Sequence, residues 1–284
     1  MQLSRTDGGG ADPAATKWLR LIEDCATKPT RRRVHDLRVL TLRIQTRLEA
    51  WAAARPVDKK AARLVRRWQK RGGWLRRRLR PVREADVFLF RLTGLRASIS
   101  APAKGSDGLR HLEKLIRAVR RDSAGELADG LRWCATKLER MGRKANRALV
   151  AEPAASISAE VSLSGLIAAT MAEYPSLDAA NLHEFRKRLK PVRYLAEHDA
   201  ALGAVPAELP ARLRSMANAI GQWHDWEQLR LVASRVADRN KNSAPLAALV
   251  AVKEAEALAA ALDLCRQGLS DLATGEAIAF SELV

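Results

Sequence analysis

Hydrophobic residues recur at three- and four-residue steps along most of this chain, a spacing that predicts α-helices rather than strands. The clearest case is the segment from Thr30 to Ala53, which carries one apolar stripe: Val34, Leu37, Thr41, Ile44 and Leu48. Because Thr30 precedes this stripe, its hydroxyl is well placed to cap the helix. Strand-like alternation never extends beyond a few residues. We therefore expect an all-α protein built from helical bundles.

Glycine, proline and serine divide the rest of the chain into further predicted helices. These helices are expected at about residues 58–70, 74–99, 109–122, 125–149 and 165–174, with another starting within 177–182. Gly72-Gly73 is expected to stop the first of them. The predicted domains are a flexible tail over 1–12, an N-terminal bundle over 13–150, a linker over 151–164 and a C-terminal bundle over 165–284.

An internal repeat is the most informative feature of the sequence. Val34–Arg43 reads VHDLRVLTLR and Leu182–Pro191 reads LHEFRKRLKP, so both begin with an apolar residue, His, an acid, an apolar residue and Arg. Each copy is followed by a second related segment, Leu79–Asp86 in the first half and Ile220–Glu227 in the second. Two halves with the same ordered pair of motifs predict a duplicated helical bundle.

Helix geometry gives each motif segment an apolar face and a histidine-headed basic face. The basic face of the first copy holds His35, Arg38 and Arg43. The basic face of the second copy holds His183, Arg186, Lys187, Lys190, Arg193 and Tyr194, opposite an apolar face of Phe185, Leu189, Val192 and Ala196. A third basic stripe is formed by Arg76, Arg80 and Arg83, and the repeat aligns Arg83 with His224.

The net charge of +18 is concentrated in the first half of the chain. Residues 1–150 contain 37 Lys+Arg and 15 Asp+Glu, whereas residues 151–284 contain 13 and 17. Folding does not require such a concentration of positive charge, so this charge predicts a polyanionic partner. The three cysteines are far apart, the N-terminus lacks the apolar segment of a signal peptide, and no run of about 18 apolar residues occurs. We therefore expect a cytoplasmic protein with no disulfide framework and no membrane insertion.

These ordered motifs resemble the CHAD domain family, a family named for its conserved histidine and α-helical fold. Val34–Arg47 resembles the first signature helix of that family, and Leu182–Glu197 resembles the second. Pro81–Val87 and Gly221–Asp225 resemble the two downstream signatures, so the likeness spans about residues 14–270. The resemblance implies two pseudo-symmetric antiparallel helical bundles that flank a central basic channel.

The resemblance further implies binding of inorganic polyphosphate, often at polyphosphate granules. Because the sequence has no catalytic motif and no histidine pair at metal-ligand spacing, we expect this binding to be non-enzymatic, with no cofactor and no metal. Together with the helix faces, the resemblance leads us to expect these binding residues: His35, Arg38, Arg43, Arg47, Arg76, Arg80, Arg83, His183, Arg186, Lys187, Lys190, Arg193 and His224. Guanidinium forks suit phosphate oxygens, and lysines and protonated histidines add positive charge. The chain departs from the family pattern at Leu42, Gln45 and Pro191, where the proline is expected to kink its helix.

Several alternatives remain open at this point. The basic faces have a plainer interpretation as solvated surfaces of helices. Similarly, a motif histidine could serve only an internal hydrogen-bond network. Nucleic acid is the competing polyanion. A metal-dependent phosphohydrolase would use the four carboxylates Glu84, Asp86, Asp225 and Glu227, although an acid beside an arginine more often forms an ion pair. No phosphate-binding loop or nucleophile motif occurs, and the seven tryptophans are expected to be packing anchors between helices.

Overall fold

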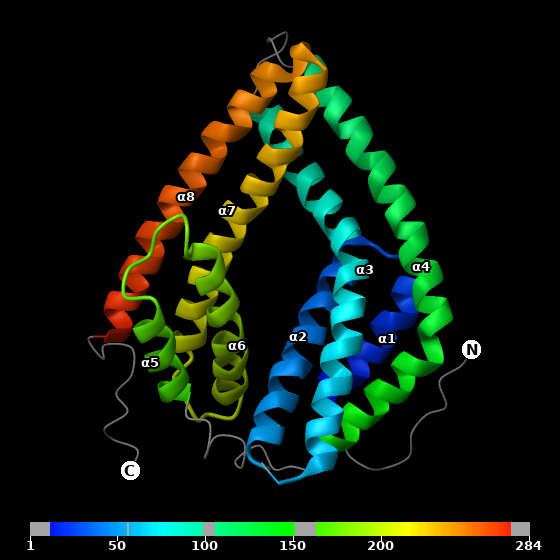
Figure 1. Cartoon of the computed structure of the whole chain (residues 1–284), viewed down its shortest axis with the longest axis vertical. Coiled ribbons are helices and arrows are strands. Elements are labelled where there is room, and N and C mark those ends of the chain that lie inside the picture. The colour runs from blue at the N-terminus through cyan, green and yellow to red at the C-terminus, as the bar shows by residue number, and fades with distance from the viewer. Residues whose placement is uncertain (1–11, 56, 99–105, 151–162, 274–284) are drawn as a thin grey trace. The chain divides into compact units, whose positions relative to one another are not determined.

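The computed structural model describes residues 12–55, 57–98, 106–150 and 163–273, and within these ranges all regular structure is helical. The helices are α1 (Pro13–Thr27), α2 (Arg31–Ala53), α3 (Lys59–Ser98), α4 (Ser106–Val150), α5 (Leu163–Glu173), α6 (Leu182–Ala201), α7 (Glu208–Arg239), the short 3₁₀ helix η2 (Lys241–Ser243) and α8 (Ala244–Ala273) (Figure 1). The predicted all-α class is confirmed. As expected, the Thr30 side chain caps α2 by accepting a hydrogen bond from the Arg33 amide.

Two predicted helix breaks are wrong, because α3 and α4 each run through them without interruption. At the first, Gly72 packs so closely on α2 that a Cβ there would lie 3.2 Å from Cγ2 of Thr41. The glycine therefore permits close helix packing instead of ending the helix. At the second, α4 continues through residues 122–125 although Gly125 has open space around it. A glycine inside a helix costs only about 1 kcal/mol, which burial of the flanking apolar residues outweighs.

The chain divides into two compact units, and both long helices contribute to each of them. The first unit contains α1, α2, α3 as far as Arg80 and α4 from Ala124 onward. The second contains the rest of α3 and α4 together with α5 to α8. The sequence instead places its one boundary after residue 150. The predicted tail and linker lie outside the described residues except for Asp12, which caps α1, and Leu163 and Ser164, which begin α5.

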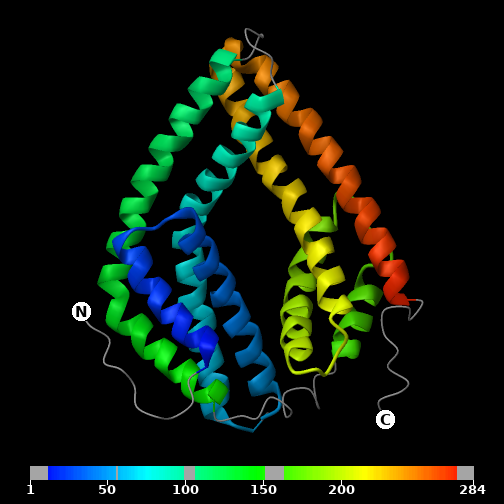
Figure 2. The same cartoon turned by 180° about the vertical axis from the view of Figure 1, so that it is seen from behind.

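The first unit is held together by two tryptophans that meet the motif helix α2. Trp18 and Trp68 are fully buried with ring centroids 5.1 Å apart. Their indole nitrogens donate to the hydroxyl and the carbonyl of Thr41, at 2.8 and 3.1 Å. The five residues of the predicted apolar stripe of α2 are all buried, which confirms that face. Figure 2 shows α1 and α2 in blue, with α1 packed along α2.

In the second unit, α6 packs on α7, and α7 runs beside α8 (Figure 1). The predicted apolar face of α6 is confirmed, since Phe185, Leu189, Val192 and Ala196 are all buried. The placement of Tyr194 on the exposed basic face is wrong, because Tyr194 is also buried. Its ring is covered by the guanidinium of Arg193, which lies 4.5 Å from the ring centroid. The helix α6 continues through Pro191 to Ala201.

The prediction that all tryptophans are packing anchors is wrong for one residue. Trp18, Trp68 and Trp223 are buried, but the side chain of Trp133 is exposed on α4. Within the described ranges, no helix combines the length and the apolar character needed to cross a lipid bilayer.

Candidate functional site

The second unit gathers predicted site residues from three helices around one carboxylate. Asp225 on α7 accepts two hydrogen bonds from Arg83 on α3, at 2.8 and 3.3 Å. His183 on α6 and His224 on α7 bring their ring centroids within 4.8 Å of each other. Arg186 on α6 interacts electrostatically with both Asp225 and Arg83. Residues from both motifs of the second half and from α3 therefore lie close together. We call this group the Asp225 cluster, and its members are Arg83, Arg91, His183, Arg186, His224 and Asp225.

Arg186 reaches this cluster because α7 has no side chain where the two helices approach. A Cβ at Gly221 would lie 3.0 Å from Nη2 of Arg186, a tighter contact than side chains normally make. The Nε atom of Arg186 is buried and makes no hydrogen bond within the described residues. Burial lowers the pKa of Arg186, and the charge of Asp225 opposes that shift. Gly221 in the Gly-Gln-Trp-His-Asp segment therefore has a structural role that the motif alone did not explain.

Arg91 belongs to the cluster but is absent from the predicted site. Its guanidinium lies 5.1 Å from the ring centroid of Trp226, and it interacts electrostatically with Asp225 and Arg83. Burial is the main cause that lowers its pKa. Arg91 follows Arg83 by about two helical turns of α3. The sequence signal that could have found it is therefore the continuation of the Arg76, Arg80, Arg83 stripe along the same helix.

Both histidines of the cluster have a lowered pKa. Burial is the first cause for each, and the charge of Arg186 lowers both values further. For His224 the carboxylate of Glu227, whose oxygen lies 3.0 Å from Nδ1, acts in the opposite direction. The ordinary value for a histidine is about 6.5, so both imidazoles are mainly neutral at pH 7 in the free protein. A negative charge placed beside these rings would favour their protonated forms.

The other predicted binding residues of α6 differ in their solvent exposure. Lys187 is exposed and forms an ion pair with Glu184 at 2.6 Å. Lys190 is half-buried. Arg193 is mostly enclosed, with its Nε 3.6 Å from a carboxylate oxygen of Glu197 and its guanidinium over Tyr194. Lys187 is therefore the residue of this stripe most open to a ligand, whereas Arg193 mainly stabilises α6.

In the first unit, α2 and α3 combine their basic residues through direct contacts. Arg38 donates to the backbone carbonyl of Arg76 at 3.2 Å, and Arg76 donates to the side-chain carbonyl of Gln45 at 2.6 Å. Gln45 is one of the departures from the family pattern, and here its amide orients a neighbouring arginine. His35 and Arg80 are exposed on the same two helices.

Two further predicted residues of α2 differ in their surroundings. Arg43 is half-buried. Arg47 forms a 2.6 Å ion pair with Asp12, in which both side chains are largely enclosed. Because Asp12 also caps α1, this pair ties the start of α1 to α2. The structure therefore gives Arg47 a role in holding helices together.

Two of the four carboxylates that suggested a metal-dependent enzyme form ion pairs with arginines. The expected ion pairs are confirmed for Asp225, which pairs with Arg83, and for Asp86, whose Oδ1 accepts from Arg120 at 3.0 Å. Glu227 contacts His224. Among the described residues, no group of three or more His, Cys, Asp or Glu side chains is arranged to hold a metal ion.

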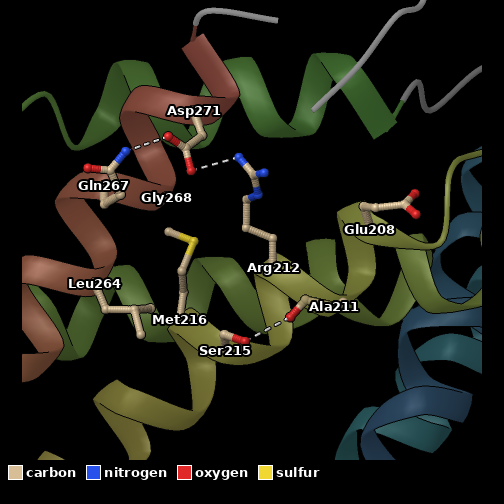
Figure 3. A pocket seen from close by; sticks show the side chains of 9 residues that line it. All are labelled: Glu208, Ala211, Arg212, Ser215, Met216, Leu264, Gln267, Gly268 and Asp271. Carbon is tan, nitrogen blue, oxygen red and sulfur yellow. Dashed lines mark hydrogen bonds and ion pairs between the residues drawn. The ribbon is translucent and has the colours of Figure 1, made fainter. Parts of the chain in front are cut away.

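A separate cavity of about 600 Å³ lies in the second unit, away from these motif residues (Figure 3). It is lined by side chains of α7 and α8, among them Met216 and Leu264. Its one arginine, Arg212, forms a 2.8 Å ion pair with Asp271, and Glu208 adds a further negative charge at the rim. With its positive charge neutralised in this way, the cavity does not suit a polyanion.

The family model that matches is described as the CHAD domain and covers residues 11–234. A crystal structure of the CHAD domain from the plant Ricinus communis is similar in fold, with a TM-score of 0.60 and 19% sequence identity over 94% of this chain and 95% of that chain. Among curated proteins, none matches this chain.

Proposed function

This chain belongs to the CHAD domain family, and on that premise we propose that it binds inorganic polyphosphate without acting on it as an enzyme. The observation that supports this proposal best is the Asp225 cluster. Three guanidiniums, those of Arg83, Arg91 and Arg186, share one carboxylate there. Positive charge therefore remains in excess in this cluster. Phosphate oxygens suit guanidiniums, which bind them in a fork geometry.

The first unit supports the same proposal with a second basic face. His35 and Arg80 are exposed, and Arg38 and Arg76 are positioned beside them by the contacts between α2 and α3. A flexible chain of phosphates engages many cations at once, so two basic faces on one protein increase its effective affinity. The duplication, the central basic channel and the association with polyphosphate granules stay predictions.

The experiment that tests this function is a titration with polyphosphates of defined length at two salt concentrations. A site that neutralises six or more phosphates should lose about 10³-fold or more in affinity between about 50 and 200 mM salt, because bound counterions are released. Long-chain polyphosphate should also displace duplex DNA at equal phosphate concentration. Binding that is insensitive to salt, or DNA that displaces polyphosphate, would contradict the proposal. Release of phosphate in the presence of Mg²⁺ or Mn²⁺ would contradict its non-enzymatic part.

Acidification should have opposite effects on the stability of the free protein and on its affinity for polyphosphate. The pKa values of His183 and His224 are lowered on folding, so the unfolded chain binds more protons. Stability should therefore decrease as the pH falls from about 7.5 through the unfolded value of about 6.5. Bound phosphates favour the imidazolium form, so affinity should increase over the same range.

These two pH effects are measured by urea unfolding and by polyphosphate titration at pH 7.5 and pH 5.5. The double variant His183→Gln, His224→Gln should show a weaker pH dependence in both measurements. His111 is an exposed histidine of α4 outside the cluster, so His111→Gln is the matched control and should behave like the parent. Affinity that falls on acidification would show that the imidazoles do not face the phosphates.

A further inference from the structure

One tryptophan of this protein is exposed to solvent on a basic helix. Trp133 of α4 has a relative exposure of 78%, whereas Trp18 and Trp68 of the same unit are fully buried. An indole ring is large and mostly apolar, so leaving it in water is unfavourable by comparison with burial. The free fold does not use this side chain for packing. The ring is therefore accessible to a ligand.

The residues that share this helix face with Trp133 are cations. At about 100° per residue, the positions i, i+4, i+7, i+11 and i+14 lie on one stripe, and they hold Trp133, Lys137, Arg140, Lys144 and Arg147. All of them except Lys144 are exposed. With a rise of 1.5 Å per residue, this stripe is about 21 Å long. The opposite face of the same segment is buried in the first unit and contains Leu131, Cys134, Leu138, Met141 and Ala145.

Within the described residues, no carboxylate forms an ion pair with Arg140, Lys144 or Arg147. The nearest acid along the helix, Glu139, pairs with Arg143 at 2.6 Å. The ammonium group of Lys137 lies 5.0 Å from the centroid of the Trp133 ring, a cation–π contact that holds a positive charge beside the aromatic surface. The stripe therefore combines one aromatic ring with a row of cations.

We propose that this stripe of α4 binds single-stranded nucleic acid, with an unpaired base stacked on Trp133 and the phosphates following Lys137 to Arg147. Proteins that bind single strands combine an aromatic ring with a row of cations, because every unpaired base offers a ring face for stacking. Polyphosphate has no base to stack, and the bases of a duplex are already stacked on one another. The length of the stripe suits about four nucleotides, the lower end of the range for such sites. None of these five residues belongs to the Asp225 cluster.

The test measures binding of a fluorescently labelled 12-mer of deoxythymidine to the full chain and its variants. Trp133→Ala should weaken binding roughly 10- to 100-fold, the loss expected when one stacked base loses its platform. Trp133→Phe keeps an aromatic ring and should retain most of the affinity. Phe90→Ala removes another exposed aromatic side chain, on α3 of the second unit, and should leave binding unchanged. Affinity for polyphosphate should be unchanged in all three variants, which separates this inference from the proposed function.

Four results would overturn the inference. The first is a Trp133→Ala variant that binds the oligonucleotide as tightly as the parent. The second is an equal loss in Phe90→Ala. The third is a Trp133→Ala variant that loses polyphosphate binding to the same extent. The fourth is a dimer in sedimentation experiments that dissociates on Trp133→Ala, because a second copy of the chain would then be the partner of this face.

Discussion

Replacing Asp225 with alanine is expected to lower the free energy of unfolding by about 3 kcal/mol, the cost of removing one partner from a largely buried ion pair. The side chains of Arg83 and Asp225 are only 26% and 14% exposed, and their two hydrogen bonds would be lost. The loss also leaves Arg83, Arg91 and Arg186 close together without their shared carboxylate. Urea unfolding of the full chain measures this change.

Polyphosphate should restore much of the stability that Asp225→Ala removes, because bound phosphates would neutralise the three guanidiniums. Ligand binding stabilises a folded protein in proportion to the logarithm of ligand concentration over Kd, so the variant should gain more from polyphosphate than the parent. Asp86→Ala is the matched control. It breaks an ion pair with Arg120 of the same unit and of similar exposure, 26% and 10%, outside the Asp225 cluster.

Two outcomes would contradict this prediction. Asp225→Ala could prove as stable as the parent, which would mean that the ion pair contributes no net stability. Polyphosphate could also stabilise Asp86→Ala as strongly as Asp225→Ala, which would place the bound phosphates elsewhere on the protein.

The helical class and the buried faces were predictable from the sequence because they depend on local periodicity. The stripe from Val34 to Leu48 and the stripe from Phe185 to Ala196 are both buried as expected. The continuity of α3 through Gly72 was not predictable in the same way. The glycine there is explained by Thr41 of another helix, whose side chain approaches the place that a Cβ at position 72 would occupy. Tertiary packing of this kind outweighs a local propensity of about 1 kcal/mol.

The site was partly predictable, because a repeated motif identifies its residues but not their partners. The sequence indicates His183, Arg186 and His224, and the structure brings the three together. Extending the Arg76, Arg80, Arg83 stripe along α3 leads to Arg91, but only the structure shows that this turn of α3 lies against Trp226 of α7.

Contacts that the sequence does not show also explain why two of the predicted binding residues are enclosed. Arg47 pairs with Asp12, which is 35 residues away in the sequence. Arg193 is enclosed because Tyr194 and Glu197 of its own helix pack beside it. Helix periodicity places both arginines on a basic face, but only the packed neighbours decide whether that face remains open.

The largest loss of polyphosphate binding is expected when one exposed cation in each motif region is replaced by an acidic residue. In the double variant Arg80→Glu, Lys187→Glu, one exposed cation changes sign in each unit. Neither residue is part of a hydrophobic core, so the helical signal should be retained. Affinity for long-chain polyphosphate should fall by about 100-fold, and the slope of log affinity against log salt should become shallower by about 1.5, because two phosphate contacts are lost.

The matched control is Arg110→Glu, Arg121→Glu, which changes the net charge by the same amount at two exposed positions of α4. Arg110 pairs with Asp107 much as Lys187 pairs with Glu184, so local repulsion after reversal is comparable.

The comparison of these two variants by polyphosphate titration is the most direct test of the claim that the motif faces bind the polymer. We predict a large loss of affinity in Arg80→Glu, Lys187→Glu and only a small one in the control. Equal losses in the two variants would show that net charge alone governs binding and would contradict a site on the motif helices.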